Sequence, residues 1–169
     1  MRKIFFNKYG FSFLEVMIVV AIFVIILSSV ATLTGDKTVR EDLDAQAQAV
    51  VDILNRAHNY AMTAYYGDHW GVKIFDNSSD CDEISSDCVI IFKGRNYESR
   101  NNIYDEKLLL NTSVFIDEDQ NNEFYFEKIS GWLSTSTGHL VEQALVLQTT
   151  LGTQKIVTST PTGLVYYGD

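Results

Sequence analysis

Hydrophobic and polar positions change their spacing along this chain, and the first pattern is a long apolar run at residues 11–33. Only a few polar side chains interrupt it: Ser12, Glu15, Ser28, Ser29 and Thr32. A helix needs about 20 predominantly apolar residues to span a bilayer. The run therefore predicts a transmembrane helix at 11–33.

A second pattern follows at residues 34–66, where apolar residues recur at alternating steps of four and three. They are Leu43, Ala47, Val50, Leu54, Ala57 and Ala61. This spacing places them on one face of an amphipathic helix. The stripe is short for a coiled coil, so we expect it to pack on the chain's own domain.

The third pattern, at residues 67–169, consists of short apolar and aromatic runs separated by polar, turn-rich stretches, which is typical of strands. Strands are expected at Trp70–Phe75, Val89–Lys93, Lys107–Leu110, Ser113–Ile116, Glu123–Phe126, His139–Gln148, Gln154–Thr158 and Gly163–Tyr167. We expect an antiparallel β-sheet or a small β-sandwich there. With the helix packed on it, the fold class is α+β, with a single ectodomain.

The junction before the apolar run carries the most specific signal in the sequence. Residues 1–10 contain Arg2, Lys3 and Lys8, contain no acidic residue and end at Gly10. Glycine has no Cβ, so the peptide bond after it fits a narrow protease site. Glu15 is the only charge in the apolar run, and a carboxylate deep in a bilayer costs about 2.5–3.5 kcal/mol. Such a residue indicates a function and a cationic partner.

The segment Gly10-Phe11-Ser12-Phe13-Leu14-Glu15-Val16 resembles the class III leader junction of type IV pilins and type II secretion pseudopilins. The resemblance implies that a prepilin peptidase removes leader 1–10 after Gly10 and methylates Phe11. It implies that Glu15 meets the positive N-terminus of a neighbouring subunit, since each buried charge lowers the desolvation cost of the other. Many pilins have a proline near the end of the apolar run, where this chain has Thr32.

A second resemblance covers Phe124 to Tyr167, which is similar to the second half of GspH/FimT-type minor pseudopilins. It rests on Ser130-Gly131, Thr137-Gly138 and Ser159-Thr160-Pro161-Thr162-Gly163. Together the resemblances imply a minor pilin or pseudopilin of a type IV pilus or type II secretion pseudopilus. The implied partners are other subunits, the prepilin peptidase and the inner-membrane assembly platform.

Other interpretations of the N-terminus stay open. Ser29-Val30-Ala31 fits an ordinary secretory signal cleaved after Ala31, and an uncleaved signal anchor gives the same topology without a filament. The chain would then be a secreted or membrane-anchored β protein unrelated to filaments. A pilus-tip binding module, either an adhesin or a DNA-uptake receptor, is a further alternative.

Charge predicts both topology and partners. Basic residues precede the apolar run and none follows until Lys37, so the leader is expected in the cytoplasm and the β domain in the periplasm or outside the cell. The formal charge of −9 becomes −12 once the three basic residues of the leader are removed. Nucleic acid is therefore an unfavourable partner, because the only basic grouping is the loose set Lys93, Arg95 and Arg100.

Cys81 and Cys88 flank an acidic segment that we expect to be exposed. Outside the cytoplasm a disulfide is the expected state, with two free thiols as the alternative. The pair lacks the further ligands of a zinc site. We expect the closed loop to be a surface contact loop rather than part of the core.

A second acidic stretch offers oxygen ligands at every other residue: Asp117, Asp119, Asn121 and Glu123. These four can converge on Ca²⁺. Asn122 stands where an EF-hand has glycine, and Lys128 where it has a bidentate glutamate. The alternative is a solvated acidic hairpin turn.

No catalytic pattern is recognisable in the sequence, which favours a non-enzymatic protein. His58, His69 and His139 lack metal-ligand spacing, and no phosphate-binding loop or nucleophile elbow occurs. We expect His58 to be a surface residue of the helix.

Overall fold

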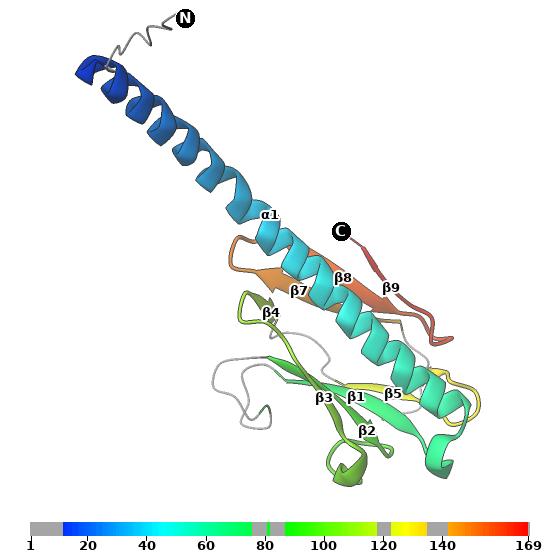
Figure 1. The fold of residues 1–169 in the computed structure, drawn as a ribbon. Helices are drawn as coiled ribbons and strands as arrows, with labels where there is room; N and C mark the ends of the chain where they lie inside the picture. Colours follow the sequence, from blue (N-terminus) through cyan, green and yellow to red (C-terminus); the bar gives the residue numbers. More distant parts are fainter. Residues whose placement is uncertain (1–11, 76–80, 82–86, 118–122, 135–141, 169) are drawn as a thin grey trace, which may run out of the picture. The chain divides into compact units, whose positions relative to one another are not determined.

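A computed structural model describes residues 12–75, 81, 87–117, 123–134 and 142–168, with the backbone alone for residues 29–36 (Figure 1). The chain divides into two compact units, residues 1–38 and 39–169. Helix α1, Phe13–Met62, contributes residues to both.

The first unit consists, in its described part, of the first half of α1. The helix begins after Ser12, whose carbonyl oxygen accepts hydrogen bonds from the backbone N–H groups of Glu15 and Val16 at 3.0 and 3.3 Å. Glu15 lies in the first turn, where a carboxylate interacts favourably with the helix dipole. Within the described residues, no helix combines the length and the apolar character that crossing a membrane requires.

The second unit contains two antiparallel sheets that flank the second half of α1 (Figure 1). The five-stranded sheet has the order β3-β2-β1-β5-β6 and the four-stranded sheet the order β4-β7-β8-β9. The strands are β1 Trp70–Phe75, β2 Cys88–Lys93, β3 Glu106–Leu109, β4 Val114–Ile116, β5 Glu123–Phe126, β6 Leu133–Ser134, β7 Gln143–Thr149, β8 Gln154–Ser159 and β9 Val165–Gly168. Two short 3₁₀ helices, η1 Tyr65–Gly67 and η3 Asn102–Tyr104, join the elements.

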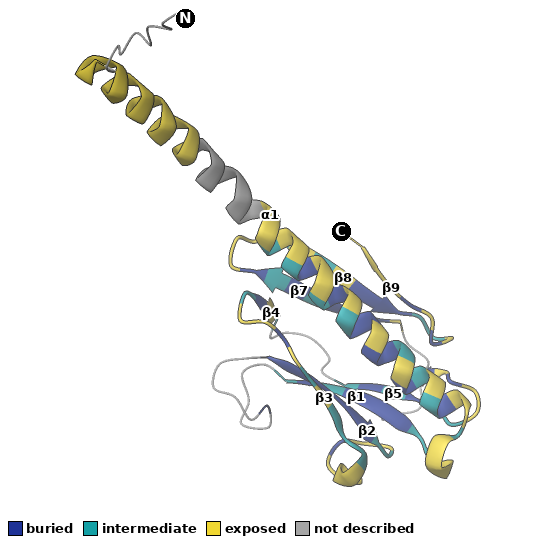
Figure 2. Ribbon diagram, viewed as in Figure 1, coloured by how far each residue is buried: buried dark blue, intermediate teal, exposed yellow. Residues whose placement is uncertain are grey.

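The predicted stripe of α1 is the centre of the main core. All six of its residues are fully buried: Leu43, Ala47, Val50, Leu54, Ala57 and Ala61. They form one hydrophobic cluster with side chains from both sheets, such as Phe124 of β5 and Leu145 of β7. Figure 2 shows buried and exposed positions alternating along this half of α1. The amphipathic helix therefore packs on its own domain, as predicted.

Strand β2 is buried on both faces of its sheet. Val89 and Ile91 enter the main core, whereas Cys88, Ile90 and Phe92 belong to a second, smaller core. A Cβ at Gly71, the register partner of Phe92 on β1, would lie 2.4 Å from the Phe92 ring. The glycine therefore leaves room for the aromatic side chain on this second face.

The α+β class and the antiparallel pairing are confirmed, with two sheets sharing the helix. The sequence predicted no strand between Phe126 and His139, which is wrong, because β6 lies there at Leu133–Ser134. Two residues are too few to show an alternating pattern. The strand predicted from His139 begins at Gln143, and residues 139–141 lie outside the described part of the chain. The last strand begins at Val165, since Gly163 has a φ of +83° in the preceding turn.

Candidate functional site

The apolar half of α1 is exposed throughout its described length. Every described side chain from Ser12 to Ser28 is exposed, and Phe13 reaches 80% (Figure 2). Large apolar side chains surround the helix here, whereas a helix on a domain surface has one apolar stripe. An apolar surface of this extent indicates contact with lipid or with other helices.

Glu15 is exposed among these apolar side chains. No ion-pair partner for its carboxylate occurs in the described residues. Gly10 and Phe11, the predicted cleavage and methylation sites, lie outside the described part of the chain. The arrangement offers one carboxylate on an apolar helix to a cation supplied from elsewhere.

Two of the four predicted calcium ligands are described, and both already have partners. The carboxylate of Glu123 lies 3.4 Å from Lys73 Nζ and accepts a hydrogen bond from the backbone N–H of Tyr97 at 3.2 Å. Asp117 accepts a hydrogen bond from the side-chain amide of Gln148 at 3.4 Å. Asp119 and Asn121 lie outside the described residues, and among those described no group of three acidic, histidine or cysteine residues converges.

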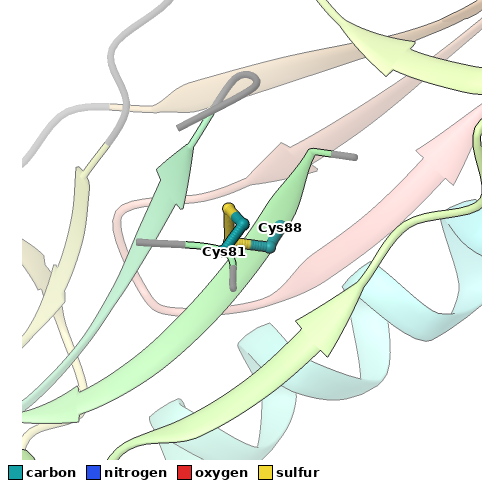
Figure 3. The surroundings of a disulfide bond; sticks show 2 residues. All are labelled: Cys81 and Cys88. Atoms are coloured by element: carbon teal, nitrogen blue, oxygen red, sulfur yellow. A yellow bond between two sulfur atoms is a disulfide. The ribbon is translucent and has the colours of Figure 1, made fainter. Parts of the chain in front are cut away.

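The predicted disulfide is present between Cys81 and Cys88 (Figure 3), with a Cα–Cα distance of 5.8 Å. Its surroundings correct the sequence interpretation, because both cysteines are fully buried. They form the second core with Ile90, Phe92 and Tyr97. The disulfide is therefore part of a core that covers the outer face of β2, while residues 82–86 of the loop that it closes lie outside the described part of the chain.

Asp87 also departs from the expected exposed acidic segment. It is buried, and its carboxylate accepts a hydrogen bond from the backbone N–H of Ile116 on β4 at 2.7 Å. Its carbonyl oxygen accepts the N–H of Leu110 at 2.9 Å. A carboxylate with a backbone donor is a strong hydrogen-bond acceptor. Asp87 thus connects the start of β2 with β4 of the other sheet.

His58 was expected on the helix surface, and the structure places it in a slot instead. Its ring meets Phe126 edge-on at 5.6 Å, and its Nε2 is buried without a hydrogen-bond partner. Burial lowers the pKa of His58 below its ordinary value. A buried imidazole without an acceptor avoids carrying charge. His58 is therefore a neutral packing residue, and it shows no arrangement suited to catalysis.

Two glycines lie against the Nε2–Cδ2 edge of the His58 ring. A Cβ at Gly131 would lie 2.5 Å from His58 Nε2, and a Cβ at Gly163 would lie 2.4 Å from the same ring. Both have positive φ, at +67° and +83°. These glycines belong to the Ser130-Gly131 and Thr162-Gly163 motifs noted in the sequence. The structure brings the two motifs together on one helix residue.

The sequence analysis did not identify a group of aromatic rings beyond the end of α1. Tyr65 and Tyr66 of η1 have ring centroids 4.3 Å apart, and Tyr66 lies 4.7 Å from Tyr104 of η3. The Lys93 ammonium lies over the Tyr104 and Tyr66 rings, 4.7 and 5.7 Å from their centroids. We call these four residues the tyrosine cluster. The adjacent pair Tyr65-Tyr66 was visible in the sequence, but its ring partners come from other segments.

The loose basic grouping does not form a shared basic patch. Arg100 pairs with Asp105 at 2.8 Å and stacks on the Tyr97 ring at 3.4 Å. Lys93 lies over the tyrosine rings, while Arg95 is exposed. This dispersal gives no concentrated positive surface for a phosphate backbone.

Comparison with known proteins gives one match. Residues 6–31 match the family model of the prokaryotic N-terminal methylation motif. No curated protein and no solved structure matches the chain. The matched segment includes Gly10, Phe11 and Glu15, and it supports a type IV pilin-like precursor that assembles with other pilin subunits.

Proposed function

We propose that this chain is a non-enzymatic filament subunit, a minor pilin or pseudopilin of a type IV pilus or type II secretion pseudopilus. The observation that carries the proposal is the match of residues 6–31 to the N-terminal methylation motif. Within the type IV pilin and pseudopilin superfamily, we assign this chain to the GspH/FimT-like branch. The Ser130-Gly131 and Thr162-Gly163 motifs, which converge on His58, support this assignment.

In this proposal the precursor is anchored in the inner membrane through residues 11–33, with the leader in the cytoplasm and the β domain outside. The apolar run in the sequence and the basic leader support that topology. A prepilin peptidase cleaves after Gly10 and methylates Phe11. An inner-membrane platform then transfers the subunit into the filament.

Assembly uses the apolar half of α1. Its exposed side chains would be covered by the helices of neighbouring subunits, which removes apolar surface from lipid and water and packs it closely. Glu15 would pair with the methylated N-terminal amine of a neighbour. A mismatch in register would leave both charges unpaired, so the contact also selects the stacking register.

The decisive experiment is the intact mass of the mature protein isolated from its native host. A mature chain that begins at methylated Phe11 is the expected result. A chain that begins at Thr32 would replace the proposal with ordinary secretion, and a chain that retains residues 1–10 would indicate an uncleaved anchor. The precursor from cells lacking the peptidase serves as the mass reference.

A further inference from the structure

The tyrosine cluster combines exposed rings with a strained backbone. Tyr66 has a φ of +52° and Ala64 a φ of +48°, both in the left-handed region. This region costs a non-glycine residue about 1–2 kcal/mol. Tyr65 and Tyr66, in η1 after α1, are nevertheless 44% and 56% exposed. A strained backbone that holds a partly exposed aromatic ring is an arrangement that occurs at functional sites.

The ammonium of Lys93 is the second unusual feature. Five cationic residues are half-buried in the described part of the second unit, and four have an oxygen partner. Lys73 pairs with Glu123, Arg100 with Asp105 and Lys155 with Asp44, and Lys128 donates to the carbonyl of Gly67. For Lys93, the described residues offer no oxygen within hydrogen-bonding distance, and its ammonium lies over the Tyr104 and Tyr66 rings.

The charges of Asp68 and Lys93 interact, but no ion pair or hydrogen bond joins the two side chains. Burial acts to raise the pKa of Asp68, but hydrogen bonds from His69 and the charge of Lys93 outweigh it and lower that pKa. The Asp68 carboxylate is hydrogen-bonded to the backbone and ring nitrogens of His69, at 2.9 and 3.3 Å. Glu106 is likewise occupied by Arg56 and Tyr60, at 2.7 and 3.0 Å. Among the residues that the structure describes, the Lys93 ammonium therefore has no hydrogen-bond acceptor and keeps its N–H donors for a ligand.

We propose that the tyrosine cluster is a binding site for a saccharide that carries a carboxylate. The C–H face of a sugar ring packs on the exposed tyrosine rings, and its carboxylate accepts hydrogen bonds from Lys93. The hydroxyl groups of Tyr65 and Tyr66, 3.4 Å apart, provide polar contacts at the rim for sugar hydroxyls. This site does not depend on filament assembly.

The charge of the molecule restricts the ligand further. The mature chain carries a net side-chain charge of −12, which repels a polyanion such as nucleic acid. A ligand with one carboxylate places its charge at the unpaired ammonium and presents little charge elsewhere. A neutral sugar would use the rings but leave the Lys93 charge uncompensated.

The test uses the full chain in detergent micelles and calorimetric titration with 3′-sialyllactose, with lactose as the matched sugar lacking the carboxylate. We expect sialyllactose to bind at least tenfold more tightly than lactose, and more weakly at high salt. No binding of sialyllactose at millimolar concentration, or equal binding of the two sugars, would overturn the proposal. Tighter binding of single-stranded oligothymidine at these residues would also overturn it.

Variants locate the site. Tyr66→Asn removes the ring and introduces a residue that tolerates the left-handed backbone. We expect this variant and Lys93→Gln each to weaken sialyllactose binding at least tenfold. Tyr166→Ala removes a tyrosine of similar exposure, 48%, from β9 and should leave binding unchanged. Tyr66→Gly should lose binding while its melting temperature stays level or rises, because glycine relieves the strain. Equal loss of binding in Tyr166→Ala, or full binding in Lys93→Gln, would refute the assignment.

Discussion

His58 is a residue whose chemistry is determined by its neighbours. The ring lies against Phe126 and between Gly131 and Gly163, and its Nε2 finds no partner. Burial lowers the pKa of His58 in the folded state, so the unfolded chain takes up a proton first as the pH falls. The stability that depends on a neutral His58 is fully present above pH 6.5, the ordinary histidine value, and declines from there down to the folded-state pKa.

We therefore predict that His58→Gln reduces the acid sensitivity of the domain. Urea unfolding of the full chain in detergent should show that the free energy of unfolding of the wild type falls between pH 6.5 and pH 5 more steeply than that of the variant. The slopes of the unfolding free energy against pH should differ by at most about 1.4 kcal/mol per pH unit, which corresponds to the uptake of one proton. Parallel pH profiles for the two proteins would contradict the prediction.

The turns that surround His58 join the two sheets to the helix. The N–H of Leu133 on β6 donates to the carbonyl of Pro161, in the turn between β8 and β9, at 2.9 Å. In the turn before β6, Ile129 donates to the carbonyl of Ala61 in the last turn of α1, also at 2.9 Å. These short connections therefore give a partner to a carbonyl in the last turn of α1 and to a backbone N–H at the edge of the five-stranded sheet.

The packing role of these turns can be separated from backbone strain. Gly131→Ala and Gly152→Ala both place a Cβ on a residue with positive φ, +67° and +77°. Each should lose about 1–2 kcal/mol of unfolding free energy from strain. Only the Cβ at Gly131 would also meet His58 and Met62, since nothing lies within 4 Å of a Cβ at Gly152. Gly131→Ala should thus lose a further ~1–3 kcal/mol.

Chemical denaturation of the two variants and the wild type measures this difference. Adding His58→Ala to Gly131→Ala should recover part of the extra loss, because the new Cβ then no longer meets the His58 ring. The double-mutant cycle measures the energy of that contact. Equal destabilisation by Gly131→Ala and Gly152→Ala would show that the slot is looser than the structure indicates.

In the molecule as a whole, the apolar half of α1 and the β domain differ in whether their apolar side chains are buried. The domain buries its own apolar stripe on two sheets, whereas the apolar side chains of residues 12–28 are all exposed. The domain therefore covers its helix stripe with its own sheets, while the apolar segment presents a surface that favours contact with lipid or other helices. This contrast is the physical basis for expecting assembly through α1.

Glu15→Ala should abolish incorporation into filaments without impairing membrane insertion. Loss of the carboxylate removes a group that costs about 2.5–3.5 kcal/mol in a bilayer, so insertion should be equal or easier. Immunoblots of sheared filaments and of membranes separate the two steps. Glu41→Ala, which removes an exposed carboxylate farther along the same helix, is the control. Normal incorporation of Glu15→Ala would eliminate the proposed docking contact.

Several parts of the candidate sites could be predicted from the sequence. Gly10, Phe11 and Glu15 lie within six residues of one another in a local motif, and the comparison with family models identifies the same segment. The stripe from Leu43 to Ala61 was recognisable because a helix repeats every 3.6 residues. The cysteine pairing was also foreseen, since the two residues are close in the chain.

Other features were missed because they depend on distant residues. The unbroken apolar run from Cys88 to Phe92 is a sign of burial on both faces, yet the acidic residues before it suggested an exposed loop. The tyrosine cluster needs η1, η3 and the end of β2 to meet. No periodicity in the sequence indicates that these three segments lie close together.

The sequence by itself determined the processing motif, the apolar and amphipathic halves of α1 and most of the strands, because each depends on local spacing. Only the tertiary structure decided that two sheets share the helix, that His58 is enclosed by two glycine turns and that Lys93 lies over tyrosine rings. These features form when apolar surfaces from distant parts of the chain are buried together away from water. Local spacing in the sequence does not show which surfaces will meet.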